Sequence, residues 1–225
     1  MSQINKKQFD RSYADKTYSI DSVYDHIIRI RHRYLSDKSG RLFDHGFGNG
    51  VNAMYFEREG FDVYGVDVSE SAKQLIDDLF PDKKDHYHQI GVTQTEFPFD
   101  DGFFDVAVSN QVIYFIPDLQ QIQSTLKELH RILKPGGKLV MTTMAEENCY
   151  FTDYSDGWKI DQGVVEVTVK GRIERHFNIF KFKNAEAFAD LIKQAGFEVD
   201  HLGYFDFGLM DTSCAKHHIV LARKP

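Results

Sequence analysis

The stretch Asp44-His45-Gly46-Phe47-Gly48-Asn49-Gly50 decides the fold expected for this chain of 225 residues. It follows a short apolar run at 41–44 and precedes a run with helical spacing at 51–59, so it predicts a strand, a tight turn and a helix. In an open parallel sheet this junction lies at the carboxyl edge, where ligands bind. Glycines at alternate positions let the backbone pass closely under a ligand, because a Cβ atom there would occupy the ligand's volume.

A carboxylate at the end of the next strand adds to this motif. The run 61–68 predicts a second strand that ends at Asp67, seventeen residues past Gly50, and Ser69 can cap the following helix. A carboxylate in that place can accept two hydrogen bonds from a ribose diol, which favours a nucleoside ligand. The dinucleotide fingerprint needs a third glycine where this chain has Val51, so a nicotinamide cofactor is less favoured.

The alternation of strand and helix continues through the middle of the chain. Further strands are predicted at 87–92, 104–109 and 138–144, with helices at 69–79 and 118–133. Alternating strands and helices form parallel sheets with right-handed crossovers. The pattern therefore predicts a doubly wound α/β fold with helices on both faces of the sheet.

The last third of the chain departs from this alternation and then resumes it. Two β-rich runs at 164–170 and 172–182 flank Gly171 and predict a hairpin inserted after the fifth strand. A helix at 184–194 and two more strands, beginning near Phe197 and His217, follow it. The expected sheet is therefore seven-stranded and mostly parallel.

These segments are expected to form one domain over residues 1–225. Residues 1–35 are predicted to be an N-terminal helical arm or lid, of which 1–20 is expected to be mobile and Asp21-Ser22 to cap a helix. Residues 146–183 carry many aromatic side chains and are predicted to form a cap over the site.

Composition limits the partners and the location. The net charge of −7 leaves no broad cationic surface, so nucleic acid and anionic membranes are not expected as partners. Cys149 and Cys214 are too few for a disulfide framework, and with no signal peptide or membrane span in the sequence a soluble, cytoplasmic protein is expected. The histidines predict no metal site; His217 and His218, for example, are adjacent on a strand and point to opposite faces.

Four motifs in order resemble those of the class I methyltransferases that use S-adenosylmethionine, in the small-molecule subgroup with an N-terminal helical arm. They are Asp44-x-Gly46-x-Gly48-x-Gly50, Gly65-Val66-Asp67-Val68-Ser69, Phe97-Pro98-Phe99-Asp100-Asp101-Gly102-Phe103-Phe104-Asp105 and Arg131-Ile132-Leu133-Lys134-Pro135-Gly136-Gly137. The resemblance runs from about Gln8 to Arg223. It implies a Rossmann-like fold, S-adenosylmethionine as the cofactor, and direct displacement of its methyl group by a nitrogen or oxygen atom of a small molecule.

The resemblance also implies roles for individual residues. Asp44 and Gly46 would lie by the methionine moiety, Gly48 and Gly50 beneath it, Asp67 on the ribose hydroxyls and Val68 against the adenine, while Tyr13 covers the site. His45 and Phe47 are bulkier than the family's usual residues, and Thr93 stands where a related pattern has an aspartate for the adenine amino group. Thr93 or Gln94 is therefore expected to accept that hydrogen bond. The predicted cofactor-binding residues are Tyr13, Asp44, Gly46, Gly48, Asn49, Gly50, Asp67, Val68, Thr93, Gln94 and Asn110.

Residues that face the methyl acceptor are expected after the fourth and fifth strands and on the insertion. Tyr114, which follows Asn110 and Gln111, is predicted to form a pocket wall, with simple helix packing as the alternative. His176 is the predicted general base, because a hydroxyl or protonated amine must lose a proton when it is methylated. Other aromatic residues of the insertion form either a wall of the site or a small core under the hairpin; they are Tyr150, Tyr154, Trp158 and Phe177.

Alternatives remain at this point. The basic run Arg29, Arg31 and Arg33 is expected to face solvent, but turned toward the pocket it would favour an anionic acceptor. A NAD-dependent oxidoreductase and a non-catalytic adenosyl-binding domain are the two rival functions. The exposed edge of the hairpin could pair between subunits to form a homodimer.

Overall fold

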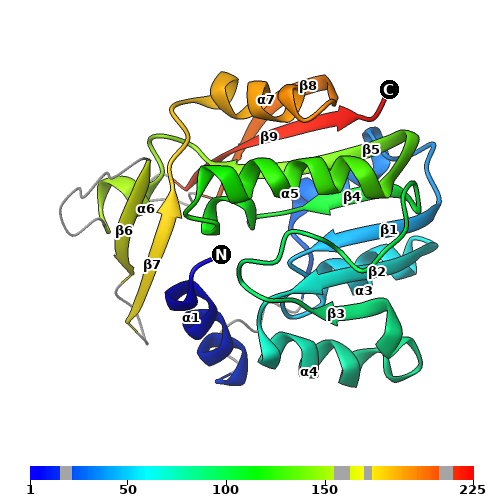
Figure 1. Cartoon of the computed structure of the whole chain (residues 1–225), viewed down its shortest axis with the longest axis horizontal. Coiled ribbons are helices and arrows are strands. Elements are labelled where there is room, and N and C mark those ends of the chain that lie inside the picture. Colours follow the sequence, from blue (N-terminus) through cyan, green and yellow to red (C-terminus); the bar gives the residue numbers. More distant parts are fainter. Residues whose placement is uncertain (16–21, 155–162, 170–173, 208–214) are drawn as a thin grey trace.

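A seven-stranded sheet forms the centre of the protein (Figure 1). In spatial order its strands are β3 (Tyr87–Gln89), β2 (Phe61–Asp67), β1 (Gly40–His45), β4 (Phe104–Ser109), β5 (Leu133–Met144), β9 (Lys216–Arg223) and β8 (Glu198–Asp206). The first five of these are parallel, and β9 runs antiparallel between β5 and β8. The computed structural model describes residues 1–15, 22–154, 163–169, 174–207 and 215–225.

Helices cover both faces of this sheet because neighbouring residues of each buried strand point to opposite sides. On β1, Phe43 joins one hydrophobic cluster and Leu42 joins the other. The cluster around Phe43 includes α5 (Leu119–Ile132) and α7 (Ala185–Gln194), whereas that around Leu42 includes α2 (Asp25–Arg33), α3 (Val51–Arg58) and α4 (Glu70–Leu79). The predicted doubly wound, Rossmann-like fold with seven mostly parallel strands is confirmed.

Side chains cap the starts of α4, α5 and α7, and one of them, Ser69, was predicted to do so. The side chains of Ser69, Asp118 and Asn184 accept hydrogen bonds from backbone N–H groups at the starts of α4, α5 and α7, at 3.1, 2.6 and 2.9 Å. These bonds satisfy donors that a helix start leaves without a partner. The predicted cap at Asp21-Ser22 is wrong in position, because α2 begins at Asp25 after Tyr24, with no side-chain cap.

The N-terminal segment is a packed helix over the described residues, so the prediction of a mobile arm is wrong for residues 3–14. Helix α1 (Gln3–Ala14) packs between α4 and the hairpin strand β7 (Arg175–Phe180) (Figure 1). Its anchor is Asn5, which is fully buried. Asn5 Nδ2 donates to the carbonyls of Phe115 and Asn178 at 2.8 and 2.7 Å, and its Oδ1 accepts from the Asn178 N–H at 2.8 Å. Residues 16–20 of the predicted arm lie outside the described residues.

The predicted hairpin is present as β6 (Val164–Val169) and β7, which pair antiparallel. The predicted turn at Gly171 lies outside the described residues. Between β5 and the hairpin, the short helix α6 (Cys149–Thr152) contributes Phe151 to a third hydrophobic cluster with Val167 and Phe177. Phe9 of α1 packs against this cluster. The hairpin and α1 therefore form one wall beside the sheet, as Figure 1 shows.

No helix in the described ranges is both long and apolar enough to span a membrane. Within the same ranges, no group of three histidine, cysteine, aspartate or glutamate side chains could hold a metal ion. The remaining short elements are the 3-10 turns η1 (Pro81–His86) and η2 (Ile113–Phe115).

Replacement of Asn5 tests how α1 is held. Asn5→Ala removes the partner of the buried Phe115 carbonyl and of the partly buried Asn178 backbone groups, and we expect it to lower the free energy of unfolding by about 2–3 kcal/mol. It should also speed hydrogen exchange at the Asn178 amide and proteolysis within α1. Ile4→Ala is the matched control, since Ile4 is 47% exposed on the same helix. Equal exchange at Asn178 in both variants would contradict the anchoring role.

Candidate functional site

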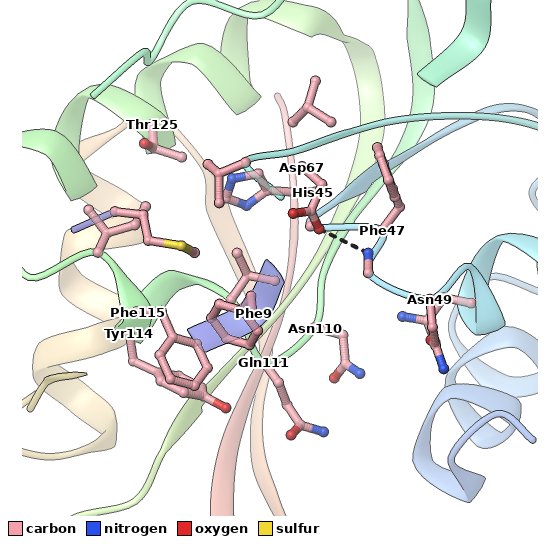
Figure 2. Close-up of a pocket in the computed structure, with 18 of the residues that line it drawn as sticks. Phe9, His45, Phe47, Asn49, Asp67, Asn110, Gln111, Tyr114, Phe115 and Thr125 are labelled. Carbon is pink, nitrogen blue, oxygen red and sulfur yellow. Dashed lines mark hydrogen bonds between the residues drawn. The ribbon is translucent and has the colours of Figure 1, made fainter. Parts of the chain in front are cut away.

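A cavity of about 480 Å³ opens at the carboxyl edge of the parallel strands. Its walls come from the loop after β1, the end of β2, the loop after β3, the segment after β4 and helix α1. Figure 2 shows His45 and Asp67 at one end of the cavity and Asn110, Gln111 and Tyr114 toward the other. The cavity lies where the strand order reverses between β1 and β4, which is the usual ligand site of this architecture.

The glycine loop that borders the cavity is held in a left-handed backbone. Gly46, Gly48 and Gly50 have φ of 77°, 53° and 80°, a region that side chains rarely allow. A Cβ on Gly46 would lie 2.5 Å from Val112 Cγ2, and one on Gly50 would lie 2.6 Å from Ile76 Cδ1. Packing inside the protein therefore favours glycine at these two positions, and the predicted reason, room for a ligand, stays a prediction. Gly48 is different, because its Cβ would project toward the covering Tyr13, 2.7 Å from the hydroxyl.

Asp67 joins the glycine loop to the end of β2. Its Oδ2 accepts from the Gly48 N–H at 2.9 Å and its Oδ1 accepts from the Ser69 N–H at 2.8 Å, and it lines the cavity. A carboxylate has about four acceptor positions, so Asp67 can still accept from a ligand beside the backbone donors at Ser69, Gly48 and Val68. Burial raises the pKa of Asp67 to about 6, although the backbone donors at Ser69 and Gly48 oppose that shift.

Asp44 is a second buried carboxylate, one strand away on β1. Neither of its oxygens has a hydrogen-bond partner in the described structure, and the side chain is 1% exposed. Burial raises the pKa of Asp44 to about 7, with a further contribution from the charge of Asp67. Together the two carboxylates give this end of the cavity a negative potential when they ionise.

Apolar residues continue the cavity beyond Asp67. Val68 follows it in the chain, and Ile90 and Phe97 lie in the same buried cluster and line the same space. His45 closes this side: its Nδ1 lies 2.9 Å from Ser109 Oγ, and burial lowers the pKa of the imidazole to about 4, so the ring is uncharged at neutral pH. The result is an apolar slot beside a carboxylate, which fits a base and ribose.

Helix α1 closes over the same end. Tyr13 lines the cavity above Gly48, and Asp10 Oδ1 accepts a hydrogen bond of 2.7 Å from the Ser69 hydroxyl. Ser69 also donates its N–H to Asp67, so one short segment connects α1 to the carboxylate. The position of α1 is therefore coupled to the geometry of Asp67.

Comparison with known proteins agrees with this geometry. The family described as a methyltransferase domain matches residues 21–202. The chain belongs to that family. The resemblance stated from the four motifs is confirmed, and the membership does not support the nicotinamide alternative.

Individual relatives of this chain are distant. Phosphoethanolamine N-methyltransferase 2 of Caenorhabditis elegans is 27% identical over 177 residues, which cover 77% of this chain and 36% of that protein. The chain spans 34–43% of the length of the first three curated relatives it matches.

Solved structures share the fold. A Methanosarcina mazei protein described as an S-adenosylmethionine-dependent methyltransferase has a TM-score of 0.72 at 20% identity, covering 90% of this chain and 98% of its own. The 1,6-didemethyltoxoflavin-N1-methyltransferase of Burkholderia thailandensis, solved with its substrate and S-adenosylhomocysteine, has a TM-score of 0.67 at 17% identity, covering 98% of this chain and 87% of its own. At these identities the likeness shows the fold alone.

The structure brings together most of the predicted cofactor-binding residues. Those that line the cavity are Tyr13, Gly46, Gly48, Asn49, Asp67, Val68, Gln94 and Asn110. Gly50 caps α3 and Asp44 lies behind the loop, so neither is among the lining residues. Thr93 is exposed and is also absent from the cavity wall, whereas Gln94 lines it and donates from Nε2 to the Glu96 carbonyl at 2.9 Å.

The two predicted catalytic residues lie in different places. Tyr114 lines the cavity and is 2% exposed, so it occupies the predicted wall. His176 is not among the described residues that line the cavity. Its side chain is 54% exposed on β7, with Nδ1 at 2.9 Å from Thr168 Oγ1 and Nε2 at 3.1 Å from Glu174. The geometry gives His176 no route to the cavity.

Of the other residues predicted on the acceptor side, some line the cavity and some do not. Phe177 belongs to the core under the hairpin, as the alternative interpretation had it, and Tyr150 packs on that core while lining the cavity. Trp158 lies outside the described residues. Arg29 pairs with Asp25, and Arg31 pairs with Glu59; neither lines the cavity, so they give no support for an anionic acceptor.

Sequence reasoning missed His217 as a site residue. It lies at the start of β9, and because β9 is antiparallel to β5 that start pairs with Met144, at the carboxyl end of β5. Both residues line the cavity. The direction of the last strand was the signal that could have placed His217 at the ligand edge.

The stability of the protein should depend on pH through Asp44. Its pKa in the folded state, about 7, exceeds the ordinary 3.8, so between about pH 4 and 7 only the unfolded chain ionises and stability falls as pH rises. Asp44→Asn removes this loss, and we expect it to raise the free energy of unfolding above pH 7 by up to about 4 kcal/mol relative to wild type.

Urea unfolding at several pH values measures this effect. Asp82→Asn is the control, because Asp82 is exposed in η1. A wild-type pH dependence retained by Asp44→Asn would contradict the assignment of the buried charge.

Proposed function

We propose that the protein is an S-adenosylmethionine-dependent methyltransferase that methylates a nitrogen or oxygen atom of a small molecule. The observation that carries the proposal is the hydrogen bond from the Gly48 N–H to Asp67 on the cavity wall. An apolar slot lies beside this carboxylate. A nucleoside needs these features together: a carboxylate for its ribose hydroxyls and apolar walls for its base.

The residues present fit the proposed cofactor. The open acceptor positions of Asp67 suit the ribose diol, and Val68, Ile90 and Phe97 supply the faces for the adenine. Gly48 leaves the space between the loop and Tyr13 free of a Cβ atom, which suits the methionine part of the molecule. In this proposal Gln94 meets the adenine edge, because it lines the cavity and Thr93 does not.

Charge supports the methylated form of the cofactor as the ligand. Asp44 and Asp67 are buried with raised pKa values of about 7 and 6, so a cation nearby stabilises their ionised forms. S-adenosylmethionine carries a sulfonium that the demethylated product lacks. The two carboxylates should therefore bind the donor in preference to its product.

When bound, the cofactor supplies an electrophilic methyl group on a good leaving group, so orientation of the acceptor accounts for much of the rate. The chain's contribution is to exclude water and hold the acceptor. Helix α1, fixed by Asn5 and linked to Ser69 through Asp10, acts in this proposal as the predicted lid. The hairpin and α6 act as the predicted cap, since Phe115 of η2 and Tyr150 line the cavity and pack in the hairpin's cluster.

Comparison with relatives supports a small-molecule acceptor, as the name of phosphoethanolamine N-methyltransferase 2 indicates for that protein. The concave, mostly apolar cavity favours the same class, because such cavities are typical of small-molecule sites.

A binding titration tests the cofactor site. S-adenosylhomocysteine should raise the melting temperature of the protein, and NAD should not. Asp67→Ala should weaken S-adenosylhomocysteine binding by about tenfold or more, because it removes charge-assisted hydrogen bonds to the ribose. Asp82→Ala, the exposed control, should bind as wild type does.

Activity is tested separately, with methyl-labelled S-adenosylmethionine and a metabolite extract. Transfer of label to a small molecule supports the proposal. Tight cofactor binding with no transfer to any compound would favour the non-catalytic adenosyl-binding domain instead.

Proton release distinguishes the two cofactor forms. At a pH between the pKa values of Asp67 and Asp44, about 6 and about 7, binding of the cationic donor should lower both pKa values and release protons. S-adenosylhomocysteine should release fewer. Calorimetry in two buffers with different ionisation enthalpies measures the difference, and Asp44→Asn should reduce it. Equal proton release for both ligands would contradict the proposed role of the carboxylates.

A further inference from the structure

The cavity has a second end, built by aromatic side chains from well-separated parts of the chain. Tyr114 comes from η2 and His217 from the start of β9; the others are Tyr24, Tyr150 and Phe207. The sheet order places β9 and β8 on the far side of β1 and β4 from β2, which carries Asp67. Figure 2 shows Tyr114 and Gln111 at this opposite end. We call these five aromatic residues the aromatic end.

No charged side chain belongs to the aromatic end. Asp67 is the one acidic residue among the described residues that line the cavity, and no lysine or arginine is among them. Two described lysines outside the cavity wall have other partners: Lys216 pairs with Glu147, and Lys181 lies over the ring of Phe151. A buried ion without a counter-ion is strongly unfavourable. This end is therefore unsuited to a charged acceptor.

One ring nitrogen of His217 has no hydrogen-bond partner in the part of the chain that the structure describes. Its ring stacks on Phe205 at 5.2 Å, and Phe205 stacks on His26 at 3.9 Å, so the imidazole plane is fixed. Nδ1 lies 2.8 Å from the Ala215 carbonyl and must donate to it, which leaves Nε2 as an unprotonated acceptor. Nε2 is buried and unpartnered among the described residues, and burial lowers the pKa of His217 to about 4.

Gln111 offers the complementary group on the wall of the same cavity. Its Nε2 is a buried donor with no partner among the described residues, and its backbone has φ of 60°. A non-glycine residue in that region costs about 1 kcal/mol or more and is typical of ligand sites. The Gln111 N–H donates to Thr142 Oγ1 at 2.7 Å, and Thr142 lies two residues before Met144, which pairs with His217. Both unpartnered groups thus lie at one edge of the sheet.

We propose that the aromatic end binds an uncharged molecule with an apolar, ring-containing body, whose hydroxyl group donates to His217 Nε2 and accepts from Gln111 Nε2. A hydroxyl is the small neutral group that can do both. The aromatic walls supply stacking area for the ring. Of the described residues that line this end none is acidic, and Asp206, whose charge acts on His217 from outside the wall, already accepts from the Ala215 N–H at 3.1 Å. A cationic acceptor would also lie beside the sulfonium of the donor. This inference rests on the proposed function, since it takes this end to be where the acceptor binds.

Four naphthalene compounds test separately how the ring system, the hydroxyl group and the charge of a ligand affect binding. 1-Naphthol, 1-methoxynaphthalene, 1-naphthoate and 1-naphthylmethylammonium share one ring system and differ in donor and charge. We expect the protein saturated with S-adenosylhomocysteine to bind 1-naphthol about tenfold or more tightly than each of the others, measured by calorimetry. Tighter binding of the anion or the cation, or no binding of 1-naphthol, would overturn the proposal.

His217→Phe keeps the stacked ring and removes Nε2. It should abolish the preference for 1-naphthol over 1-methoxynaphthalene, while S-adenosylhomocysteine binding stays as in wild type. His218→Gln is the matched control: His218 is the neighbouring buried histidine, and its Nε2 already lies 2.7 Å from Glu146. A preference for 1-naphthol retained by His217→Phe would overturn the role of Nε2.

Nitrogen-15 spectra of the wild-type imidazoles test the same contact without a variant. The Nε2 resonance of His217 should be that of an unprotonated nitrogen and should move upfield when 1-naphthol is added, while that of His218 stays in place. An unmoved His217 resonance at saturating 1-naphthol would overturn the proposal. Failure of S-adenosylhomocysteine to bind at all would instead count against the proposed function, so the two failures are distinguishable.

Discussion

The hydrogen bond from the Gly48 N–H to Asp67 Oδ2, at 2.9 Å, is the contact on which the site depends. It fixes the loop after β1 against the end of β2, and it requires a left-handed backbone that Gly46, Gly48 and Gly50 supply. The same carboxylate accepts from Ser69, which begins α4 and is linked through its hydroxyl to α1. One buried carboxylate thus organises two strands, two helices and the cavity between them.

The sequence predicted the sheet well because its signals are local. Alternating apolar runs and capping residues such as Ser69 and Asp118 determine where strands end and helices begin, and parallel order follows from the alternation. The N-terminal helix was missed as a packed element because its anchor is a polar residue. Asn5 bonds to Phe115 and Asn178, which are far away in the chain, and no local pattern reveals such contacts.

In the candidate site, too, the residues in local motifs were predicted and those positioned by long-range contacts were not. The carboxyl ends of β1 and β2 could be placed from motifs, and their residues border the cavity. The acceptor side depends on where distant segments meet. His176, chosen for its chemistry, lies exposed on β7, whereas His217 reaches the cavity through the antiparallel pairing of β9 with β5. The cavity that results has carboxylates at one end and uncharged aromatic groups at the other, an arrangement suited to a cationic donor and a neutral acceptor.

A crystal structure with S-adenosylhomocysteine bound tests the central claim most directly. We predict that both ribose hydroxyls will lie within hydrogen-bond distance of Asp67, with the Gly48 to Asp67 bond retained and the sulfur directed toward Asn110 and Tyr114. Density for the ligand outside this cavity, or inside it with Asp67 unbonded to the ribose, would contradict the account.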